Sequence, residues 1–385
     1  MLLIALPVLI AERAIHRDID FVYFYAAPKI AHLSPESLYD PKVERAFCQQ
    51  ILPPADAAKT YGDFMYPPFV PLLFLPLSHL SLGTAYRVEQ AFCAVLYIFG
   101  LVLLRRRFFP GEPQLTSILI PLALAYLPFI ADTWANGQLS ILGFIAISIA
   151  LCELRAEHPF RSGLALSLCV YKPPLLILLL PMLLFRRQIR VLLGFAAGAF
   201  IWAAAATIAY GWNVWLAYER YVRFLSRDME RLRPLAKYVD LTAFFSLLGV
   251  RQSASLFAIL CGLLTLPFLV AAWRRYEDSP QFAWGIAITW TLILSPYAPV
   301  YDTILVIPSM IVSADRLRLG RYQLLVPSLL LLFACSWTSE ATALLAHLQL
   351  LTVAIALIGS LQIAACLRSG PEQGLCHVTV GARMT

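Results

Sequence analysis

Apolar runs about as long as a bilayer is thick recur from one end of the chain to the other. A helix needs roughly 20 apolar residues to cross the hydrocarbon core of a membrane. Only 14% of the residues are charged, whereas soluble domains carry about 25%. The sequence therefore predicts an all-α integral membrane protein, a polytopic helical bundle of about 10–12 transmembrane helices in one domain over residues 1–368. Spans are expected near 1–14, 83–104, 115–131, 138–154, 189–210, 254–273, 281–295, 300–314, 322–336 and 342–366.

Two apolar segments are expected to depart from a simple span. Residues 161–185 are too long for one helix and contain KPP at 172–174. Because proline ends or kinks a helix, we expect a broken helix or a helix pair that meets near Lys172. Residues 66–80 are rich in proline, and we expect a half-helix that does not cross. The first run is interpreted as a short or truncated span rather than a signal peptide, because no basic leader precedes it.

The formal charge of +7 arises largely from basic clusters that lie between the apolar runs. Under the positive-inside rule the clusters lie in the cytoplasm. We expect no nucleic-acid binding, which would require a continuous basic face. The basic clusters lie at 105–107, 155–161, 185–190, 273–275 and 315–321. The loops left on the extracytoplasmic side are 15–82, 132–137, 211–252, 296–302 and 337–341.

The loop 211–252 does not follow this charge rule. Its arginines alternate with aromatic residues such as Trp215 and Tyr218, a pattern typical of an amphipathic helix that lies in the membrane interface with arginines near lipid phosphates. A surface helix with an ordinary solvated face explains the pattern equally well. The polar tail 369–385 is expected to be disordered.

The cysteines and histidines indicate no metal centre. Eight cysteines, mostly inside apolar runs, show no C-x-x-C spacing, and six histidines include no H-E-x-x-H. Such cysteines behave as small buried hydrophobes. The chain also has no glycine-rich phosphate loop.

Two acids, Asp18 and Asp20, stand near the start of the loop 15–82 and lead into four aromatic residues. An acid within hydrogen-bond reach of a substrate hydroxyl can act as a general base. Rings such as Tyr23 and Tyr25 offer a sugar an apolar face and a phenolic hydroxyl. Alternatively, Asp20 caps the next helix and the aromatics form an interfacial belt. The residues alone leave both interpretations open.

Lys172 is the main candidate for binding an anion. A lysine between two apolar half-segments costs about 2.5–3.5 kcal/mol on insertion scales, so such a residue is rarely kept in a membrane without a partner. The alternative is a lysine that marks a helix end and reaches the interface. Arg220 and Arg223 are secondary candidates.

Several polar residues lie next to expected spans. Asn136 and Gln138 can bind sugar hydroxyls or simply form a turn, for which Asn-Gly is a strong signal. Tyr301 and Asp302 precede a span, where substrate binding and helix capping are both possible. Tyr66, followed by two prolines, is expected to shape the rim of a cavity.

The order of these motifs resembles glycosyltransferase family 87 over about residues 15–310. Each motif alone is common, and the ordered set carries the resemblance. One departure is SPYAPVYD at 295–302, where mannosyltransferase members carry a histidine-containing stretch. The motifs are DFVYFY (20–25), LYD (38–40), YPPFVPLLFLPL (66–77), NGQLSILGF (136–144), GLALSLCVYKPPLLILLLP (163–181) and LSPYAPVYDTILV (294–306).

This family belongs to the GT-C superfamily of multispanning enzymes that use polyprenyl-phosphate sugars. The resemblance implies a GT-C-type bundle in the bacterial inner membrane, with an extracytoplasmic first loop of short amphipathic helices. It implies inverting transfer of mannose or another hexose or pentose from the lipid-linked donor to a glycolipid or glycan, with no metal or other cofactor. The base would be Asp20, or alternatively Asp18, and Lys172, Arg220 and Arg223 would bind the phosphate. Sugar or acceptor would contact Tyr23, Tyr25, Tyr66, Asn136, Gln138, Tyr301 and Asp302.

A transporter, or a flippase of lipid-linked sugars, is the main alternative. Broken helices and a buried Lys172 suit a transporter. The long aromatic first loop and the lack of inverted repeats in the sequence favour the transferase.

Overall fold

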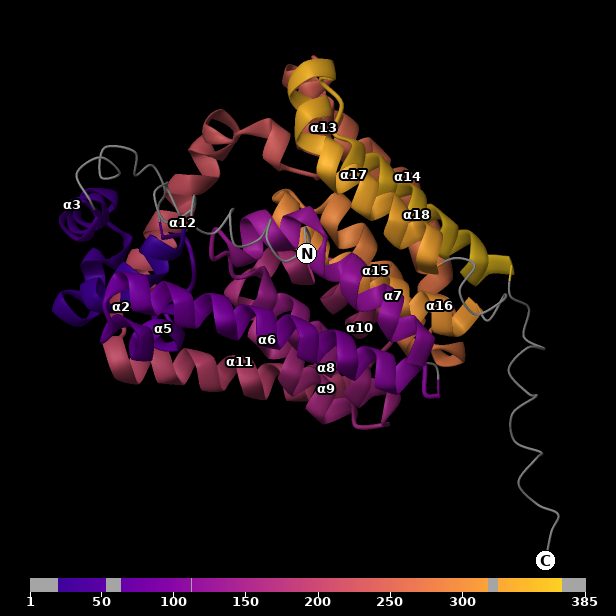
Figure 1. Ribbon diagram of the computed structural model, residues 1–385, viewed down its shortest axis with the longest axis horizontal. Coiled ribbons are helices and arrows are strands. Elements are labelled where there is room, and N and C mark those ends of the chain that lie inside the picture. The colour runs from indigo at the N-terminus through magenta and orange to yellow at the C-terminus, as the bar shows by residue number, and fades with distance from the viewer. Residues whose placement is uncertain (1–19, 53–63, 112, 318–324, 369–385) are drawn as a thin grey trace, which may run out of the picture.

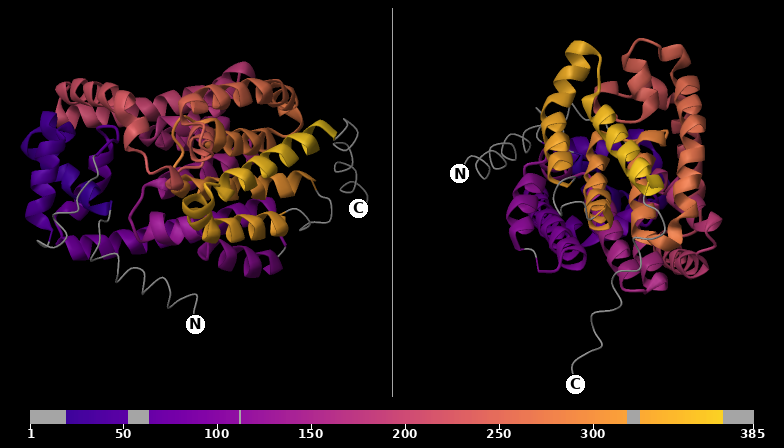
Figure 2. Two further views of the ribbon diagram at one scale, coloured as in Figure 1. Left: turned by 90° about the horizontal axis from the view of Figure 1, so that it is seen from above. Right: turned by 90° about the vertical axis from the view of Figure 1, so that its right-hand side faces the viewer.

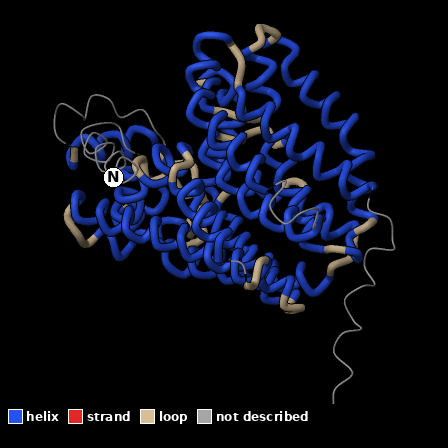
Figure 3. Tube along the Cα trace, turned by 45° about the vertical axis from the view of Figure 1, so that its right-hand side comes forward, coloured by secondary structure: helices blue, strands red, loops and turns tan. Residues whose placement is uncertain are grey.

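The computed structural model describes residues 20–52, 64–111, 113–317 and 325–368. Every regular element in these ranges is a helix (Figure 3), and an isolated β-bridge joins Tyr238 to Pro299. The predicted all-α class is confirmed. The expected span 1–14, Asp18 and the tail 369–385 lie outside the described residues.

The N-terminal half carries the first loop and the broken helix. Short helices α2, α3 and α5 gather at one end of the molecule (Figures 1 and 2), from which α6 and α11 extend. The elements are α2 (Phe21–Leu33), η1 (Pro35–Tyr39), α3 (Pro41–Ile51), α5 (Val70–Ser78), α6 (Leu82–Phe108), α7 (Pro113–Leu124), η2 (Pro128–Trp134), α8 (Ser140–Arg155), α9 (Pro159–Leu166), η3 (Ser167–Tyr171), η4 (Pro173–Leu176) and α10 (Leu179–Phe185).

The C-terminal half begins with three long helices joined by short ones. In Figure 1, α14, α17 and α18 slant together along one side of the molecule. The elements are α11 (Ile189–Tyr210), α12 (Asn213–Leu232), η5 (Leu235–Lys237), α13 (Leu241–Leu247), η6 (Arg251–Ser253), α14 (Ala254–Arg274), η7 (Tyr276–Asp278), α15 (Pro280–Leu294), η8 (Val300–Leu305), α16 (Val306–Leu317), α17 (Leu325–Ala346) and α18 (Leu350–Arg368).

Five described helices are long and apolar enough to cross a membrane, namely α6, α11, α14 with η6, α17 and α18. A bent pair formed by α7 and η2 would make six. Other expected spans form shorter helices, with 16 residues in α8 and 15 in α15. The count of five or six candidate spans refers only to the described residues. The chain is thus a polytopic helical membrane protein.

The segment 161–185 is broken at Lys172, as predicted. Lys172 has an extended backbone, with φ −142° and ψ 81°, between the short helices η3 and η4. Pro173 favours this conformation because its ring disfavours a helical residue before it. The same segment packs closely on α11, since a Cβ added to Gly163 or Gly194 would lie within 2.0 Å of a backbone oxygen.

The predicted break at 337–341 is wrong. Helix α17 continues to Ala346, and the chain turns at 347–349. Two of the polar residues there have partners, since the Thr338 hydroxyl donates to the Ala334 carbonyl of its own helix at 3.0 Å and the Ser339 hydroxyl accepts from the Leu351 amide at 3.2 Å. Hydroxyls satisfied in this way do not interrupt an apolar helix.

The first loop is only partly amphipathic. In α3, Asp40 accepts a hydrogen bond from the Lys42 amide at 2.9 Å, and Glu44 and Cys48 form a buried face. In α2, by contrast, ten of thirteen residues are buried, so this helix is a core element rather than an amphipathic one. The nine-residue α5 packs on α2 and is too short to cross a bilayer.

The predicted amphipathic helix in the loop 211–252 is α12. It buries Val214, Ala217 and Tyr221, which share one face at helical spacing. Its buried face packs on η1, where the ring of Tyr39 lies 5.7 Å from that of Tyr221. The first loop and α12 are thereby fixed to one another.

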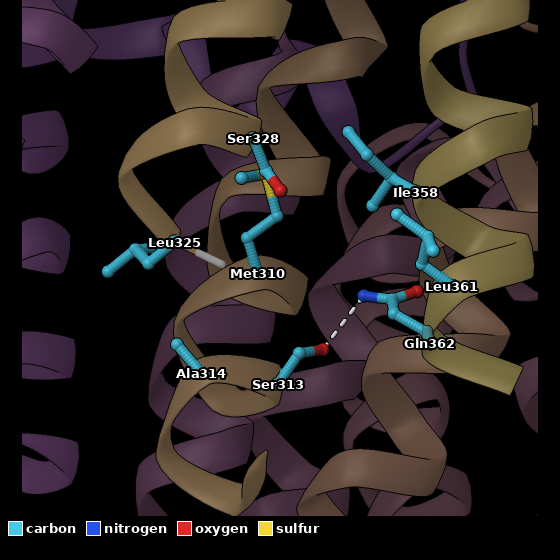
Figure 4. Close-up of a pocket in the computed structure, with 8 residues that line it drawn as sticks. All are labelled: Met310, Ser313, Ala314, Leu325, Ser328, Ile358, Leu361 and Gln362. Carbon is cyan, nitrogen blue, oxygen red and sulfur yellow. Dashed lines mark hydrogen bonds between the residues drawn. The ribbon is translucent and has the colours of Figure 1, made fainter. Parts of the chain in front are cut away.

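The C-terminal helices are joined by a polar contact in their core. The Gln362 carboxamide of α18 donates to Ser309 at 3.0 Å and to Ser313 at 2.8 Å, both on α16. Figure 4 shows Gln362 pointing toward Ser313 across a pocket of about 30 Å³. This small pocket lies apart from the polar residues described next.

Candidate functional site

Asp20 is fixed to the loop that follows η2. The Asp20 amide donates to Asn136 Oδ1 at 3.1 Å, and Asn136 Nδ2 donates back to Asp20 Oδ2 at 2.8 Å. The Gln138 carboxamide donates to the same Oδ2, and the Phe21 amide donates to the Asn136 carbonyl at 3.0 Å. The half-buried carboxylate is therefore held in one orientation by two neutral carboxamides.

The loop takes this shape because residue 137 is glycine. Gly137 has a φ of +74°, a backbone conformation that disfavours other residues. A Cβ at this position would also lie 2.7 Å from Phe21 Cβ. The turn then brings the Gln138 amide to the Asp132 carbonyl at 3.1 Å.

The capping interpretation of Asp20 is wrong. Asp20 precedes α2, but its side chain makes no capping hydrogen bond to that helix. Asp302 also does not cap a helix, because it lies inside η8, whose N-cap is Pro299. Both acids are oriented toward other parts of the chain, namely the 136–138 loop and Lys172.

Tyr66 connects the acid to the rest of the site. Its hydroxyl donates to Gln138 Oε1 at 3.2 Å, and its ring stacks on Tyr171 with centroids 6.2 Å apart. The Tyr39 hydroxyl holds the Tyr66 carbonyl at 2.8 Å. Burial, with the charges of Asp302 and Asp20, raises the pKa of Tyr66 well above its ordinary value, and a hydrogen bond with Tyr301 opposes this shift. Tyr66 therefore stays a neutral hydrogen-bond donor.

Lys172 forms a buried ion pair with Asp302. The Nζ–Oδ2 distance is 2.5 Å, and the side chains are 6% and 0% exposed. Ser140 donates to the other carboxylate oxygen at 2.8 Å. The ammonium also lies 4.6 Å from the Tyr301 ring centroid and 5.2 Å from that of Tyr297. This geometry excludes a lysine that merely reaches the membrane interface, and it favours Asp302 as the residue that holds Lys172.

A cavity of about 730 Å³ opens beside these residues. Tyr66, Lys172 and Tyr297 line its polar part. The rest is mostly apolar and reaches α14, whose Ile259 is 59% exposed. The cavity therefore runs from a cationic group to the exposed apolar surface of a candidate span. Its apolar lining includes Val222, Leu225, Leu241, Ala258, Ile259, Gly262, Ile293 and Leu294.

Arg233 is a lining residue that was absent from the sequence-based candidates. It follows α12 and lies in the same cavity, where its guanidinium pairs with Asp240 at 2.5 Å. In the sequence it is one of several basic residues in the loop 211–252, whose arginines were expected to lie near lipid phosphates. Its neighbour Pro234, which ends the helix, was the single local signal that it departs from the α12 face.

Some predicted site residues lie elsewhere. Arg220 and Arg223 are exposed on α12, where Arg223 pairs with Glu219, and neither lines the cavity. Tyr25 is buried, and its hydroxyl donates to the Leu80 carbonyl at 2.7 Å. Tyr23 is buried in α2.

The described residues contain no group of three or more histidine, cysteine or acidic side chains that could hold a metal ion. The site contains the half-buried carboxylate of Asp20 and the buried cations Lys172 and Arg233, which lie beside a largely apolar cavity. Tyr66 lines this cavity and contacts Gln138, which holds Asp20. Such groups can take a proton from a hydroxyl and stabilise an anion.

Comparison with known proteins finds a match to one family. A family model described as glycosyltransferase family 87 matches residues 64–296, more than half of the chain. No curated protein and no solved structure matches the chain significantly. The matched region includes Tyr66, Gln138, Lys172 and Arg233, whereas Asp20 is tied to it by the contacts with Asn136 and Gln138.

Proposed function

The chain belongs to glycosyltransferase family 87 and is a membrane glycosyltransferase, and we propose that it transfers a sugar from a polyprenyl-phosphate donor to a glycolipid or glycan. The observation that carries this proposal is the cavity lined by both Lys172 and apolar residues. Asp20 is connected to the lining residue Tyr66 through Gln138. A lipid phosphate needs both a cation and an apolar channel.

The apolar walls of the cavity suit the polyprenyl chain. Residues of α12, α14 and α15 line it, and α14 carries a long exposed apolar surface of the kind that faces lipid. A lipid can enter sideways from the bilayer along such a surface, with its phosphate directed to Lys172. A water-soluble nucleotide sugar would gain little from these walls.

The proposed reaction is a single in-line displacement. The acceptor hydroxyl oxygen forms a bond to the anomeric carbon while the bond from that carbon to the phosphate oxygen breaks, and its electron pair leaves with the phosphate. Asp20 takes the hydroxyl proton. One displacement inverts the configuration at the anomeric carbon. Negative charge grows on the leaving phosphate, where Lys172 stabilises it.

The remaining predicted residues have supporting roles in this scheme. Asn136 and Gln138 orient Asp20, and Tyr66 positions Gln138 at the edge of the cavity. Tyr301 and Asp302 hold Lys172. The donor is itself activated, so the proposal includes no separate cofactor. We place the site on the extracytoplasmic side of a bacterial inner membrane, where the sugar is mannose or another hexose or pentose.

The test is sugar transfer by the full chain in vesicles that contain a labelled polyprenyl-phosphate sugar. Asp20→Asn should lower the rate by about 10²- to 10⁴-fold, the usual contribution of a general base. Both carboxamides donate to the same oxygen of Asp20. Asparagine can present its own oxygen there, so the loop contacts are kept while the base is removed.

Asp40→Asn is the matched control. Asp40 is an exposed acid of the same loop and caps α3, a role that asparagine fills equally well. This variant should retain its activity. An Asp20→Asn enzyme with unchanged product formation would remove Asp20 as the base. Movement of labelled lipid or solute across the vesicle, without product, would instead favour a flippase or transporter.

A further inference from the structure

Arg233 is held rigidly against the cavity by contacts on three sides. Its Nη2 pairs with Asp240 at 2.5 Å, its Nη1 donates to the Pro296 carbonyl at 3.1 Å, and its guanidinium lies 4.4 Å from the Tyr238 ring centroid. Asp240 is itself fixed, because it accepts from the Ala243 amide at 3.0 Å. The orientation of the guanidinium is therefore set before any ligand binds.

This guanidinium keeps donors that the described part of the chain does not use. Its Nε is buried and makes no hydrogen bond to any described residue. An arginine offers five N–H donors, and a buried donor left without a partner costs free energy. The side chain is only 6% exposed, yet it lines the cavity. Unused donors of a buried cation beside a cavity indicate a bound anion.

Arg233 and Lys172 belong to one connected group. Lys172 lies beside the ring of Tyr297, the Tyr238 hydroxyl donates to the Tyr297 hydroxyl at 3.3 Å, and Tyr238 carries Arg233 on its ring. A pair of tyrosines thus separates the two cations. Each cation is already neutralised by one fully buried aspartate, Asp302 or Asp240.

Resting on the function proposed above, we propose that Arg233 is a second phosphate ligand of the lipid donor and of the lipid phosphate that leaves. The planar fork of arginine fits two phosphate oxygens, which a lysine does not match. Cleavage of the phosphodiester leaves a phosphate monoester with more negative charge. Arg233 should therefore contribute most to binding the leaving lipid phosphate.

The test measures binding of undecaprenyl phosphate to the full chain in nanodiscs. Removing Arg233 alone would leave Asp240 buried without its partner, which destabilises a protein strongly. The main variant is therefore Arg233→Gln combined with Asp240→Asn, which removes both charges and keeps the cap on α13. The Kd for undecaprenyl phosphate should rise by about tenfold or more, the usual loss for a hydrogen bond to a charged group.

Three further arms sharpen this result. Undecaprenol, which lacks the phosphate, should bind the double variant as it binds the parent chain. Inorganic phosphate should not compete, because the apolar chain supplies much of the affinity. Arg233→Lys should bind better than the double variant and less well than the parent. Arg274→Gln, a change at the exposed end of α14, should leave binding unchanged.

A double variant that folds and binds undecaprenyl phosphate as tightly as the parent overturns the proposal. So does an equal loss of undecaprenol binding, which would mean that Arg233 only shapes the cavity. The proposed function fails separately if the parent chain binds undecaprenyl phosphate tightly but transfers no sugar, since the role of Arg233 in binding phosphate would then stand.

Discussion

The two ends of the site treat their charged groups differently. At the acid end, made of Asp20, Asn136 and Gln138, the carboxylate is half-buried and held by neutral carboxamides. At the cation end, made of the pairs Lys172–Asp302 and Arg233–Asp240, each cation is 6% exposed and bound to a carboxylate with no exposure. The acid is partly exposed, whereas both cations are buried.

This difference fits two kinds of chemistry. A general base must be reached by a hydroxyl and must take up its proton, which suits Asp20 better than Asp302. A phosphate ligand must stay charged while it is away from water, and a buried charge is tolerated only when it is paired. Asp302 and Asp240 supply that pairing. Tyr66 joins the ends through its bond to Gln138 and its place in the cavity.

Lys172→Gln should remove the Lys172–Asp302 ion pair of the cation end and have the largest effect on stability. It leaves Asp302 buried without its partner, which costs about 3–5 kcal/mol. Thermal unfolding in detergent should show the loss. Adding Asp302→Asn should restore most of the stability but not sugar transfer or binding of undecaprenyl phosphate. Recovery of transfer in that double variant would show that the pair is only structural.

Gly137→Ala should break the acid end while the cation end stays intact. The positive φ costs about 1–3 kcal/mol for a residue with a Cβ, and that Cβ would collide with Phe21. Transfer should fall by about tenfold or more, because the collision displaces the loop that orients Asp20 and a misplacement of about 1 Å can cost about 10²-fold, with binding of undecaprenyl phosphate unchanged.

Gly111→Ala is the control for Gly137→Ala, because it has the backbone strain of a positive φ without a collision of the new Cβ. Gly111 also has a positive φ, +82°, but a Cβ there meets nothing within 4 Å. It should lower stability without lowering the specific activity of the folded enzyme. Equal losses of specific activity in both variants would mean that the contact between Gly137 and Phe21 does not position Asp20.

Local sequence was enough to predict much of the fold. The apolar runs predicted α6, α11 and α14 close to their observed bounds, and KPP predicted the break at Lys172, whereas α18 begins at Leu350 rather than at the expected residue 342. The error at 337–341 came from treating polar residues as a loop. Hydropathy records that a side chain is polar, but not that its hydroxyl bonds to its own helix.

The site was harder to predict because its contacts join distant segments. Asp20 and Lys172 stand out locally, one by its aromatic neighbours and one by its apolar ones. Asp302 becomes the partner of Lys172 only when η8 packs near η3 and α8. Pro234 is a local signal that Arg233 leaves the α12 face, but the sequence does not show where it goes. Its place beside Asp240 and Pro296 depends on the folding of 233–240 against 296–299.

Tyr66→Phe is the smallest change and tests whether the two ends work together. It removes the hydrogen bond to Gln138 but keeps the ring that stacks on Tyr171. A neutral hydrogen bond contributes about 0.5–1.5 kcal/mol, so kcat should fall about 2- to 10-fold with little change in donor KM. Burial keeps the pKa of Tyr66 well above its ordinary value, so the loss should be the same at pH 6 and pH 8.

Tyr276→Phe, which removes a buried hydroxyl outside the cavity lining, should leave kcat unchanged. A rise in donor KM without a change in kcat would mean that Tyr66 contributes to donor binding, as Lys172 and Arg233 do, and not to the orientation of Asp20. Asp20 would then act independently of the two cations.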